Sequence, residues 1–289
     1  MSIPAGHLDR IWKDAKTWRS IRLGPVTLHL RLGRSYSRRP RFGLTLASSA
    51  RSPQRDSTSS TQDRLPETGL VVGLGEEIGP ALVRKLTDRG MRVAVLSRSE
   101  LEGVPKGQVQ TFSADVTNER ATKRAFAEII AQMGPPSLVV FGVQGWSPGR
   151  AIDVEPAAFE EAWRANCLGA FIVAQQAARA MRPTGRGTIV LLGATSGVIG
   201  RSGYLNLAVG KFGLRAIAQV MARELGPEGI HVVHLVIDAD VRTQPEGDLP
   251  HTDPLDLAEV VFGLHQQPRS VWTHELDVRP YNEAFWQHC

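Results

Sequence analysis

The amino-acid sequence predicts an α/β fold: one doubly wound domain with a parallel sheet, preceded by a disordered basic leader. Three observations support this fold class. Short apolar runs alternate with helical patterns from residue 68 onwards, a glycine-rich loop follows the first apolar run, and a basic start precedes a mildly acidic remainder. Such alternation of strands and helices is typical of a parallel sheet that is covered by helices on both faces.

The leader is predicted to span residues 1–66 and the folded domain residues 67–289. Residues 1–64 hold 13 Lys and Arg against 4 Asp and Glu, whereas the remainder holds 21 against 25. Residues 51–64 are rich in Ser, Thr, Arg and Gln and contain too little apolar surface to offset the entropy of ordering them. A basic amphipathic start followed by this stretch resembles an organelle transit peptide. A disordered extension, or a start codon chosen too far upstream, is the alternative.

Composition restricts the classes of function. The acidic balance after the leader leaves no basic stripe suited to nucleic acid, and no apolar run is long enough to cross a membrane. Cys167 and Cys289 lack metal-type spacing, and His231 and His234 fall on opposite faces of a predicted strand, so no metal site is expected. We expect a soluble intracellular protein, located in the cytoplasm, or in the mitochondrial or another organellar matrix if the leader is a transit peptide.

The secondary-structure elements follow one another in a regular order. Short apolar runs bounded by glycine, proline or polar residues are typical of buried strands, and apolar residues spaced three and four apart are typical of helices. The predicted strands are 69–74, 91–96, 109–112, 138–143, 188–192, 230–237 and 271–278. The predicted helices are 80–89, 118–133, 159–181, 203–225 and 256–264.

Local signals set several of these boundaries. The first helix carries Ala81, Leu82 and Leu86 at helical spacing and ends at Gly90, a residue typical of helix ends. Thr117 is expected to cap the second helix, because a side-chain oxygen there accepts a hydrogen bond from the first turn.

A glycine-rich loop joins the first strand to the first helix. It reads Val72-Gly73-Leu74-Gly75-Glu76-Glu77-Ile78-Gly79. Glycines let the backbone turn sharply and approach a diphosphate at a helix N-terminus, where the N–H groups and the helix dipole favour anions. Its place after the first strand of an α/β chain favours a dinucleotide-binding domain of the Rossmann type.

From about residue 67 to 243 the chain resembles the short-chain dehydrogenase/reductase family. The resemblance rests on Gly73 and Gly79, Asp115 in Ala-Asp-Val-Thr, Asn166 in Asn-Cys-Leu-Gly-Ala-Phe, and Lys211. It implies a nicotinamide cofactor, a small-molecule substrate, and a homodimer or homotetramer, since the helices that hold Asn166 and Lys211 form the dimer faces in this family. The cofactor-binding residues that it implies are Gly73, Gly75, Ile78, Gly79, Ser97, Arg98, Asp115, Val116 and Lys211.

The cofactor side departs from the family pattern. Val72 replaces a threonine, and Glu77 replaces the middle glycine, which brings a carboxylate near the expected phosphate. Residues 141–144 replace the usual Asn-Asn-Ala-Gly. Arg98 follows the second strand, where an arginine suits a 2′-phosphate and favours NADP(H) over NAD(H). Glu76 opposes this preference, because phosphate-binding members often place a basic residue there.

The catalytic side keeps a lysine and an asparagine and lacks the acid. In the family a tyrosine protonates the substrate oxygen, a lysine follows it by four residues, a serine precedes it by thirteen, and an asparagine anchors a water. Lys211 and Asn166 match, whereas Leu207 and Ala194 occupy the tyrosine and serine positions. General acid catalysis typically contributes about 10²–10⁴-fold, so ordinary carbonyl reduction is expected to be badly impaired.

Tyr204 is a candidate replacement for the missing acid. Tyr204, Leu207 and Lys211 have the spacing of the Tyr-x-x-Met-x-x-x-Lys motif of the enoyl reductases, a divergent branch that adds hydride to a C=C bond. Two helical turns separate Tyr204 from Lys211, so both are expected to face the same way. In ordinary members a tyrosine at this position only packs the pocket. Thr195 or Ser196 replaces the serine only if the intervening loop shifts.

The sequence therefore favours an NAD(P)(H)-binding oxidoreductase of altered mechanism, acting on a small carbonyl or a conjugated C=C substrate. The alternative is a catalytically inactive relative that acts as a scaffold, sensor or partner subunit, which Leu207, Ala194 and Glu77 favour. The segment 244–254, where specificity usually lies in this family, is short and favours an open pocket or a large partner.

Overall fold

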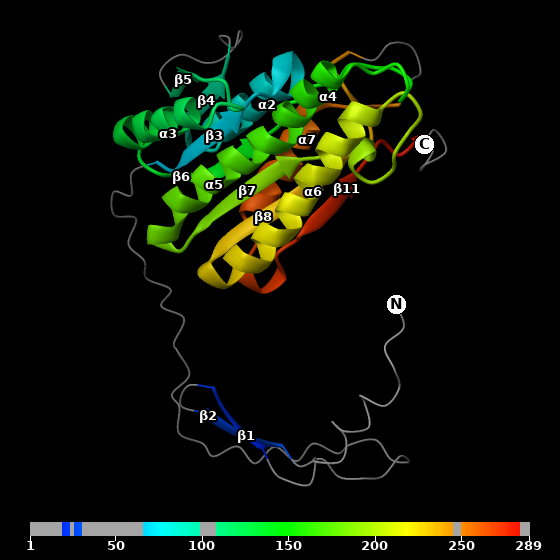
Figure 1. Ribbon diagram of the computed structural model, residues 1–289. Helices are drawn as coiled ribbons and strands as arrows, with labels where there is room; N and C mark the ends of the chain where they lie inside the picture. Colours follow the sequence, from blue (N-terminus) through cyan, green and yellow to red (C-terminus); the bar gives the residue numbers. More distant parts are fainter. Residues whose placement is uncertain (1–18, 24–25, 31–65, 99–107, 245–249, 284–289) are drawn as a thin grey trace, which may run out of the picture. The chain divides into compact units, whose positions relative to one another are not determined.

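A seven-stranded parallel sheet forms the centre of this protein (Figure 1). The computed structural model describes residues 19–23, 26–30, 66–98, 108–244 and 250–283. The strand order is β11-β8-β7-β6-β3-β4-β5, and every neighbouring pair is parallel. The strands are β3 (Thr68–Val72), β4 (Arg92–Ser97), β5 (Val109–Ser113), β6 (Pro136–Phe141), β7 (Gly187–Leu192), β8 (Ile230–Ile237) and β11 (Glu275–Val278). The predicted doubly wound α/β fold is confirmed.

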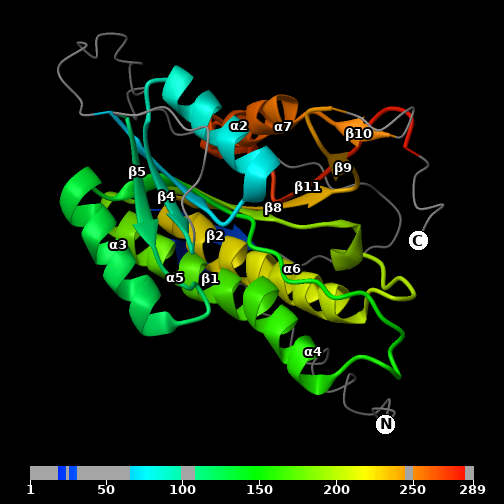
Figure 2. The same cartoon turned by 90° about the horizontal axis from the view of Figure 1, so that it is seen from above.

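Helices cover both faces of this sheet (Figure 2). On one face α2 (Gly75–Asp88) packs against α7 (Pro254–His265). On the other face α5 (Gly169–Met181) lies between α3 (Glu119–Met133) and α6 (Leu205–Leu225). The short helix α4 (Pro156–Trp163) continues through a π-helical turn, η2 (Arg164–Leu168), into α5.

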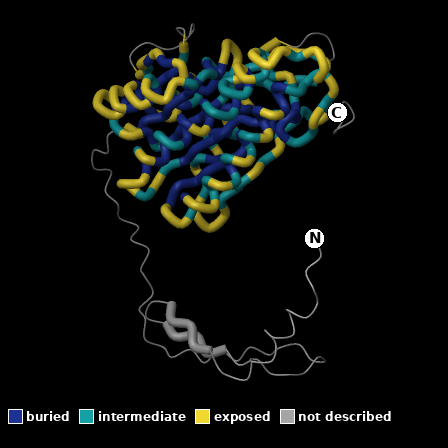
Figure 3. Tube along the Cα trace, in the orientation of Figure 1, coloured by how far each residue is buried: buried dark blue, intermediate teal, exposed yellow. Residues whose placement is uncertain are grey.

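The two faces of the sheet carry two hydrophobic clusters. On β3, Leu70 and Val72 belong to the cluster that contains Ile129 of α3, whereas Val71 belongs to the cluster that contains Leu82 of α2. Successive side chains of a strand point to opposite faces, so a strand buried on both sides is apolar throughout. Figure 3 shows these strands buried inside a shell of partly and fully exposed helix residues.

The strand order reverses at β3, which defines the place where ligands bind in this kind of sheet. From β3 the chain moves outwards to β4 and β5, and then returns to the other side of β3 with β6. In open α/β sheets the binding crevice lies outside the carboxyl ends of the strands at this switch point. The glycine loop between β3 and α2 and the loop after β6 both lie at that edge.

Several elements differ from the prediction in their bounds or caps. Helix α2 begins at Gly75 and not at residue 80, so Pro80 lies in its second turn and leaves the Glu76 carbonyl without the usual helical hydrogen bond. The cap of α3 is Asn118, whose side chain accepts from Ala121 N at 3.0 Å. Helix α6 begins at Leu205 and not at residue 203, and the last strand begins at Glu275 and not at residue 271.

The described part of the leader is a pair of short strands. β1 (Arg19–Leu23) and β2 (Val26–Leu30) pair antiparallel, an element that the prediction of a disordered leader did not include. The chain divides into two units, residues 1–60 and 61–289. The other leader residues up to 65, and Cys289, lie outside the described residues, so the boundary between 66 and 67 stays a prediction.

Candidate cofactor and reaction site

The glycine loop has the backbone of an anion-binding turn. Gly73 and Gly75 have φ of +63° and +62°, in the left-handed region that glycine adopts without strain. A Cβ at Gly73 would lie 2.2 Å from Val143 Cγ2, so glycine allows the loop after β6 to come close. A Cβ at Gly75 would meet nothing within 4 Å, which leaves open space beside the start of α2. Helix α2 thus presents its N-terminus at the switch point, as a dinucleotide requires.

The charge of the first turn of α2 works against a diphosphate. Glu76 and Glu77 both lie in this turn and are exposed. Glu77 Oε2 accepts hydrogen bonds from Thr243 N at 3.1 Å and from Thr243 Oγ1 at 2.5 Å. This contact ties α2 to the segment that follows the short strand β9 (Asp240–Val241). The backbone of the loop therefore fits a dinucleotide, while Glu76 and Glu77 place negative charge in the helix turn where a diphosphate would bind.

The predicted adenosine side lies at the same edge of the sheet. Ser97 ends β4 and Arg98 is exposed directly after it. Asp115 follows β5, and its Oδ1 accepts from Thr117 N at 2.9 Å and Thr117 Oγ1 at 2.8 Å. This turn gives Asp115 a structural role that needs no ligand. Val116 beside it is buried against the sheet.

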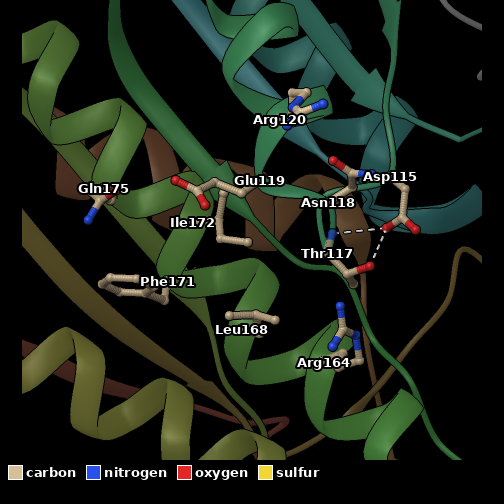
Figure 4. A pocket seen from close by; sticks show the side chains of 10 residues that line it. All are labelled: Asp115, Thr117, Asn118, Glu119, Arg120, Arg164, Leu168, Phe171, Ile172 and Gln175. Atoms are coloured by element: carbon tan, nitrogen blue, oxygen red, sulfur yellow. Dashed lines mark hydrogen bonds between the residues drawn. The ribbon is translucent and has the colours of Figure 1, made fainter.

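A pocket of about 800 Å³ opens beside Asp115 (Figure 4). It lies between the start of α3 and the helix formed by η2 and α5, and Lys211 does not line it. Its walls are Asp115, Thr117, Asn118, Glu119, Arg120, Arg164, Leu168, Phe171, Ile172 and Gln175. Phe171 is 44 % exposed there, so this pocket belongs to the outer face of α5 and not to the reaction site.

Lys211 is a buried ammonium on α6. It is 2 % exposed, and its Nζ donates a hydrogen bond to Leu192 O at 3.0 Å, at the carboxyl end of β7. Burial lowers the pKa of Lys211 to about 8, because leaving water penalises its charged form.

The two positions that lack the family's acid and serine are apolar. Leu207 lies one turn before Lys211 and is 5 % exposed. Ala194 follows β7, and the next hydroxyl, that of Thr195, donates to a carboxylate oxygen of Asp238. The Thr195 hydroxyl is therefore already engaged, and Ser196 beside it is buried.

Asn166 lies in the π-helical turn and is fully buried. Its Nδ2 donates to Gly145 O at 2.6 Å and Ala162 O at 2.8 Å, and its Oδ1 accepts from Gly145 N at 3.4 Å. A Cβ at Gly210 of α6 would lie 2.6 Å from the Asn166 Cβ, so a glycine is needed where this helix passes. Asn166 thus fastens the loop after β6 to the end of α4, and its turn packs against α6, which carries Lys211.

Tyr204 precedes α6 at the helix cap and does not lie in its first turn. Its ring stacks on Trp146, with centroids 5.1 Å apart, and the Arg201 guanidinium lies 5.1 Å from its centroid. The expectation that Tyr204 and Lys211 share a helix face assumed a helix from residue 203. Because the helix begins at Leu205, that spacing argument does not apply, and a catalytic role for Tyr204 stays a prediction.

A hydrogen-bonded cluster of His234, Glu275 and Arg215 was not predicted from the sequence. His234 is fully buried, and its Nδ1 lies 2.8 Å from Glu275 Oε2. Glu275 also accepts two hydrogen bonds from Arg215 at 2.7 Å, which with His234 lower the pKa of Glu275 to about 2. A Cβ at Gly193 would lie 2.2 Å from His234 Nε2, so the imidazole supports the strand end beside Leu192. The pairing of β8 with β11 places Glu275 opposite His234, and α6 adds Arg215 to them.

Two further absences hold within the described residues. No described helix is both long and apolar enough to span a membrane. No group of three or more His, Cys, Asp or Glu in the same ranges is placed to hold a metal ion.

Fold and site together define a class of protein: a doubly wound α/β domain whose glycine loop lies at the N-terminus of α2, as in dinucleotide-binding domains. The sequence model described as short chain dehydrogenase matches residues 67–249. The chain belongs to the short-chain dehydrogenase/reductase family.

Similar proteins carry oxidoreductase names. The 3-oxoacyl-[acyl-carrier-protein] reductase MabA of Mycobacterium avium is 34 % identical over 161 residues, which is 56 % of this chain but only 62 % of that protein. The (3R)-3-hydroxyacyl-CoA dehydrogenase of Homo sapiens is 30 % identical over 240 residues, covering 71 % of this chain and 91 % of that protein. A solved short-chain dehydrogenase from Rhodopseudomonas palustris is 32 % identical, with a TM-score of 0.66 over 74 % of this chain and 99 % of its own.

Proposed function

We propose that this protein is a reductase of altered mechanism in which Lys211 supplies the proton that the missing tyrosine would have supplied. The observation that carries the proposal is the state of Lys211: buried, with its pKa lowered to about 8, one turn after a leucine. The substrate class is a small carbonyl compound or a conjugated C=C compound, in keeping with the 3-oxoacyl and 3-hydroxyacyl names of its relatives.

The ammonium of Lys211 is suited to this task. An acid transfers a proton best when its pKa lies near the working pH, and a pKa of about 8 leaves Lys211 protonated at neutral pH. Burial strengthens its attraction for negative charge on a substrate oxygen. Leu192 O accepts one of its hydrogens and holds the Nζ in place. Bound NADPH would supply the hydride. Reduction of a conjugated C=C bond fits best, because an enolate oxygen demands less of an acid than an alkoxide does.

The residues proposed to hold the cofactor are those of the crevice. Gly73, Gly75 and the α2 N-terminus would take the diphosphate, and Arg98 would take a 2′-phosphate, which supports NADP(H) over NAD(H). The Glu77 carboxylate opposes this binding, so weak affinity for the dinucleotide is part of the proposal.

An oligomer is also proposed. Phe171 of α5 is 44 % exposed, and Phe212 and Val220 of the adjacent α6 are 42 % and 53 % exposed. Exposed aromatic and branched side chains on neighbouring helices favour a self-complementary interface, that of a homodimer or homotetramer.

The alternative is a non-catalytic relative that serves as a scaffold, sensor or partner subunit. Leu207 and Ala194 favour it, because neither offers a proton, and so does the engagement of Thr195 with Asp238. A relative of this kind would keep the fold and catalyse no reaction.

Cofactor titration separates these functions. NADPH and NADH are titrated by fluorescence into the wild type and into the double variant Leu207→Tyr/Ala194→Ser, and ketones and enones are then offered to both. We expect NADPH binding to both proteins, slow enone reduction by the wild type, and added ketone reduction by the double variant. Binding of neither dinucleotide would contradict the proposed function, and binding without turnover in the wild type would favour the alternative.

A further inference from the structure

A second pocket lies at the start of α6, apart from the glycine loop. Its volume is about 400 Å³. One wall is the turn 150–152, and the other is the segment 200–203 together with Leu205 and Ala208 of α6. Leu205 and Ala208 supply its wall on α6, whereas neither Leu207 nor Lys211 lines it. The pocket is therefore separate from the proposed position of the substrate oxygen.

The walls of this pocket are fixed to one another by hydrogen bonds. Gly149 N donates to Gly203 O at 3.1 Å, and Asn206 Nδ2 donates to Ser147 O at 2.9 Å. Arg150 O accepts from Asp153 N at 2.8 Å, which closes the turn on the other side. The two walls of the pocket are thus held in place before a ligand arrives, so little of the chain needs to be ordered on binding.

Two arginines line the pocket without a carboxylate partner. Arg150 is exposed and Arg201 is partly buried, and neither forms an ion pair with any acid in the described ranges. Arg201 is held over the Tyr204 ring, at 5.1 Å from its centroid. Arg215, which is also partly buried, is by contrast paired with Glu275. A partly buried guanidinium that is held in place but unpaired is an available site for an anion.

The remaining lining is apolar. Ile152 is 79 % exposed beside the two guanidinium-bearing residues, and Leu205 and Ala208 supply the opposite wall. A single large exposed isoleucine at the rim of a cavity gains from a ligand that covers it. Charge and apolar surface thus lie within one cavity of a size that suits a small molecule.

We propose that this pocket binds an organic anion, a phosphate or carboxylate group carried on a short apolar chain. The head group would be held by Arg150 and Arg201, and the chain would lie against Ile152 and Leu205. The site does not depend on turnover, so an inactive relative would keep it.

Calorimetry on the full-length protein tests this proposal with four probes: hexyl phosphate, hexanoate, hexanol and inorganic phosphate. We expect at least one hexyl anion to bind the wild type more tightly than hexanol and inorganic phosphate do. A preference for hexyl phosphate or for hexanoate identifies the head group. Arg150→Gln and Arg201→Gln should each weaken binding about tenfold or more, the usual effect of losing a charge-assisted hydrogen bond. Ile152→Ser should weaken the binding of hexyl phosphate and leave the binding of inorganic phosphate unchanged.

Controls separate this site from the alternatives. Arg84→Gln removes an exposed arginine of α2 and should leave all four titrations unchanged. Saturating NADPH should not displace the probe. Failure of both hexyl anions to bind, displacement by NADPH, or equal weakening by Arg84→Gln would each overturn the proposal. The proposal would also be overturned if the wild type bound no probe and Arg201→Gln no longer self-associated. In that case a second copy of the chain would cover the pocket.

Discussion

Replacement of Lys211 by methionine tests the physical state of the proposed acid without any ligand. The pKa of Lys211 falls from the ordinary 10.5 to about 8 through burial, a difference that corresponds to about 3 kcal/mol of cost to the folded state at neutral pH. Methionine has a similar shape and no charge, but it leaves Leu192 O without its donor, at a cost of about 1–3 kcal/mol. We expect Lys211→Met to be as stable as the wild type or up to about 2 kcal/mol more stable at pH 7.

The pH dependence of this stability has a definite sign. Between pH 8 and 10.5 the unfolded chain binds the Lys211 proton and the folded chain does not, so the Lys211 contribution to the free energy of unfolding rises with pH across that window. Urea unfolding of the wild type and of Lys211→Met at pH 7 and pH 9.5 measures the difference. The methionine variant should lose its advantage at pH 9.5.

An exposed lysine serves as the matched control. Lys123 of α3 pairs with Glu119 at the surface, so Lys123→Met should leave the change between the two pH values as it is in the wild type. A variant Lys211→Met that is several kcal/mol less stable than the wild type at pH 7, with no dependence on pH, would refute the account of a strained ammonium.

Three further predictions concern the crevice and its support. Glu77→Gly should bind NADPH about tenfold more tightly in a fluorescence titration, because it removes the carboxylate that opposes the diphosphate, and unchanged or weaker binding would count against this reading. Arg98→Ser should weaken the binding of NADPH and leave the binding of NADH unchanged in the same titration. An equal effect on both would mean that Arg98 does not bind the 2′-phosphate. Gly193→Ala should destabilise the protein by about 1–3 kcal/mol, since the new methyl group meets the buried His234 ring, while Gly263→Ala, with open space, should not destabilise it.

The sequence predicts the fold well because the strands are buried on both faces. β8 was predicted with its observed bounds, as an eight-residue apolar run limited by a glycine and an aspartate. The start of α2 was predicted wrongly, because a proline in a helix usually lies in the first turn. Here the helix begins at Gly75, five residues before Pro80. The π-helical turn at Asn166 was also missed, since the local pattern continues through it and the bonds that explain it come from Gly145.

Only those site residues that belong to a short sequence motif could be predicted from the sequence. The family resemblance located Lys211 and Leu207, and the burial of both follows from their face of α6. The contact between Glu77 and Thr243 joins residues 166 positions apart, and the stack of Tyr204 on Trp146 depends on how the loop after β6 closes. No local pattern predicts either contact, because each joins segments that only the folded sheet and its loops bring together.

The rate of NADPH oxidation with a small conjugated enone, measured from pH 6 to pH 10, tests the role of Lys211 most directly. We expect the rate to fall as the pH rises through about 8, and Lys211→Met to lose turnover. A Lys211→Met variant that retains the wild-type rate and pH profile would contradict this role of Lys211.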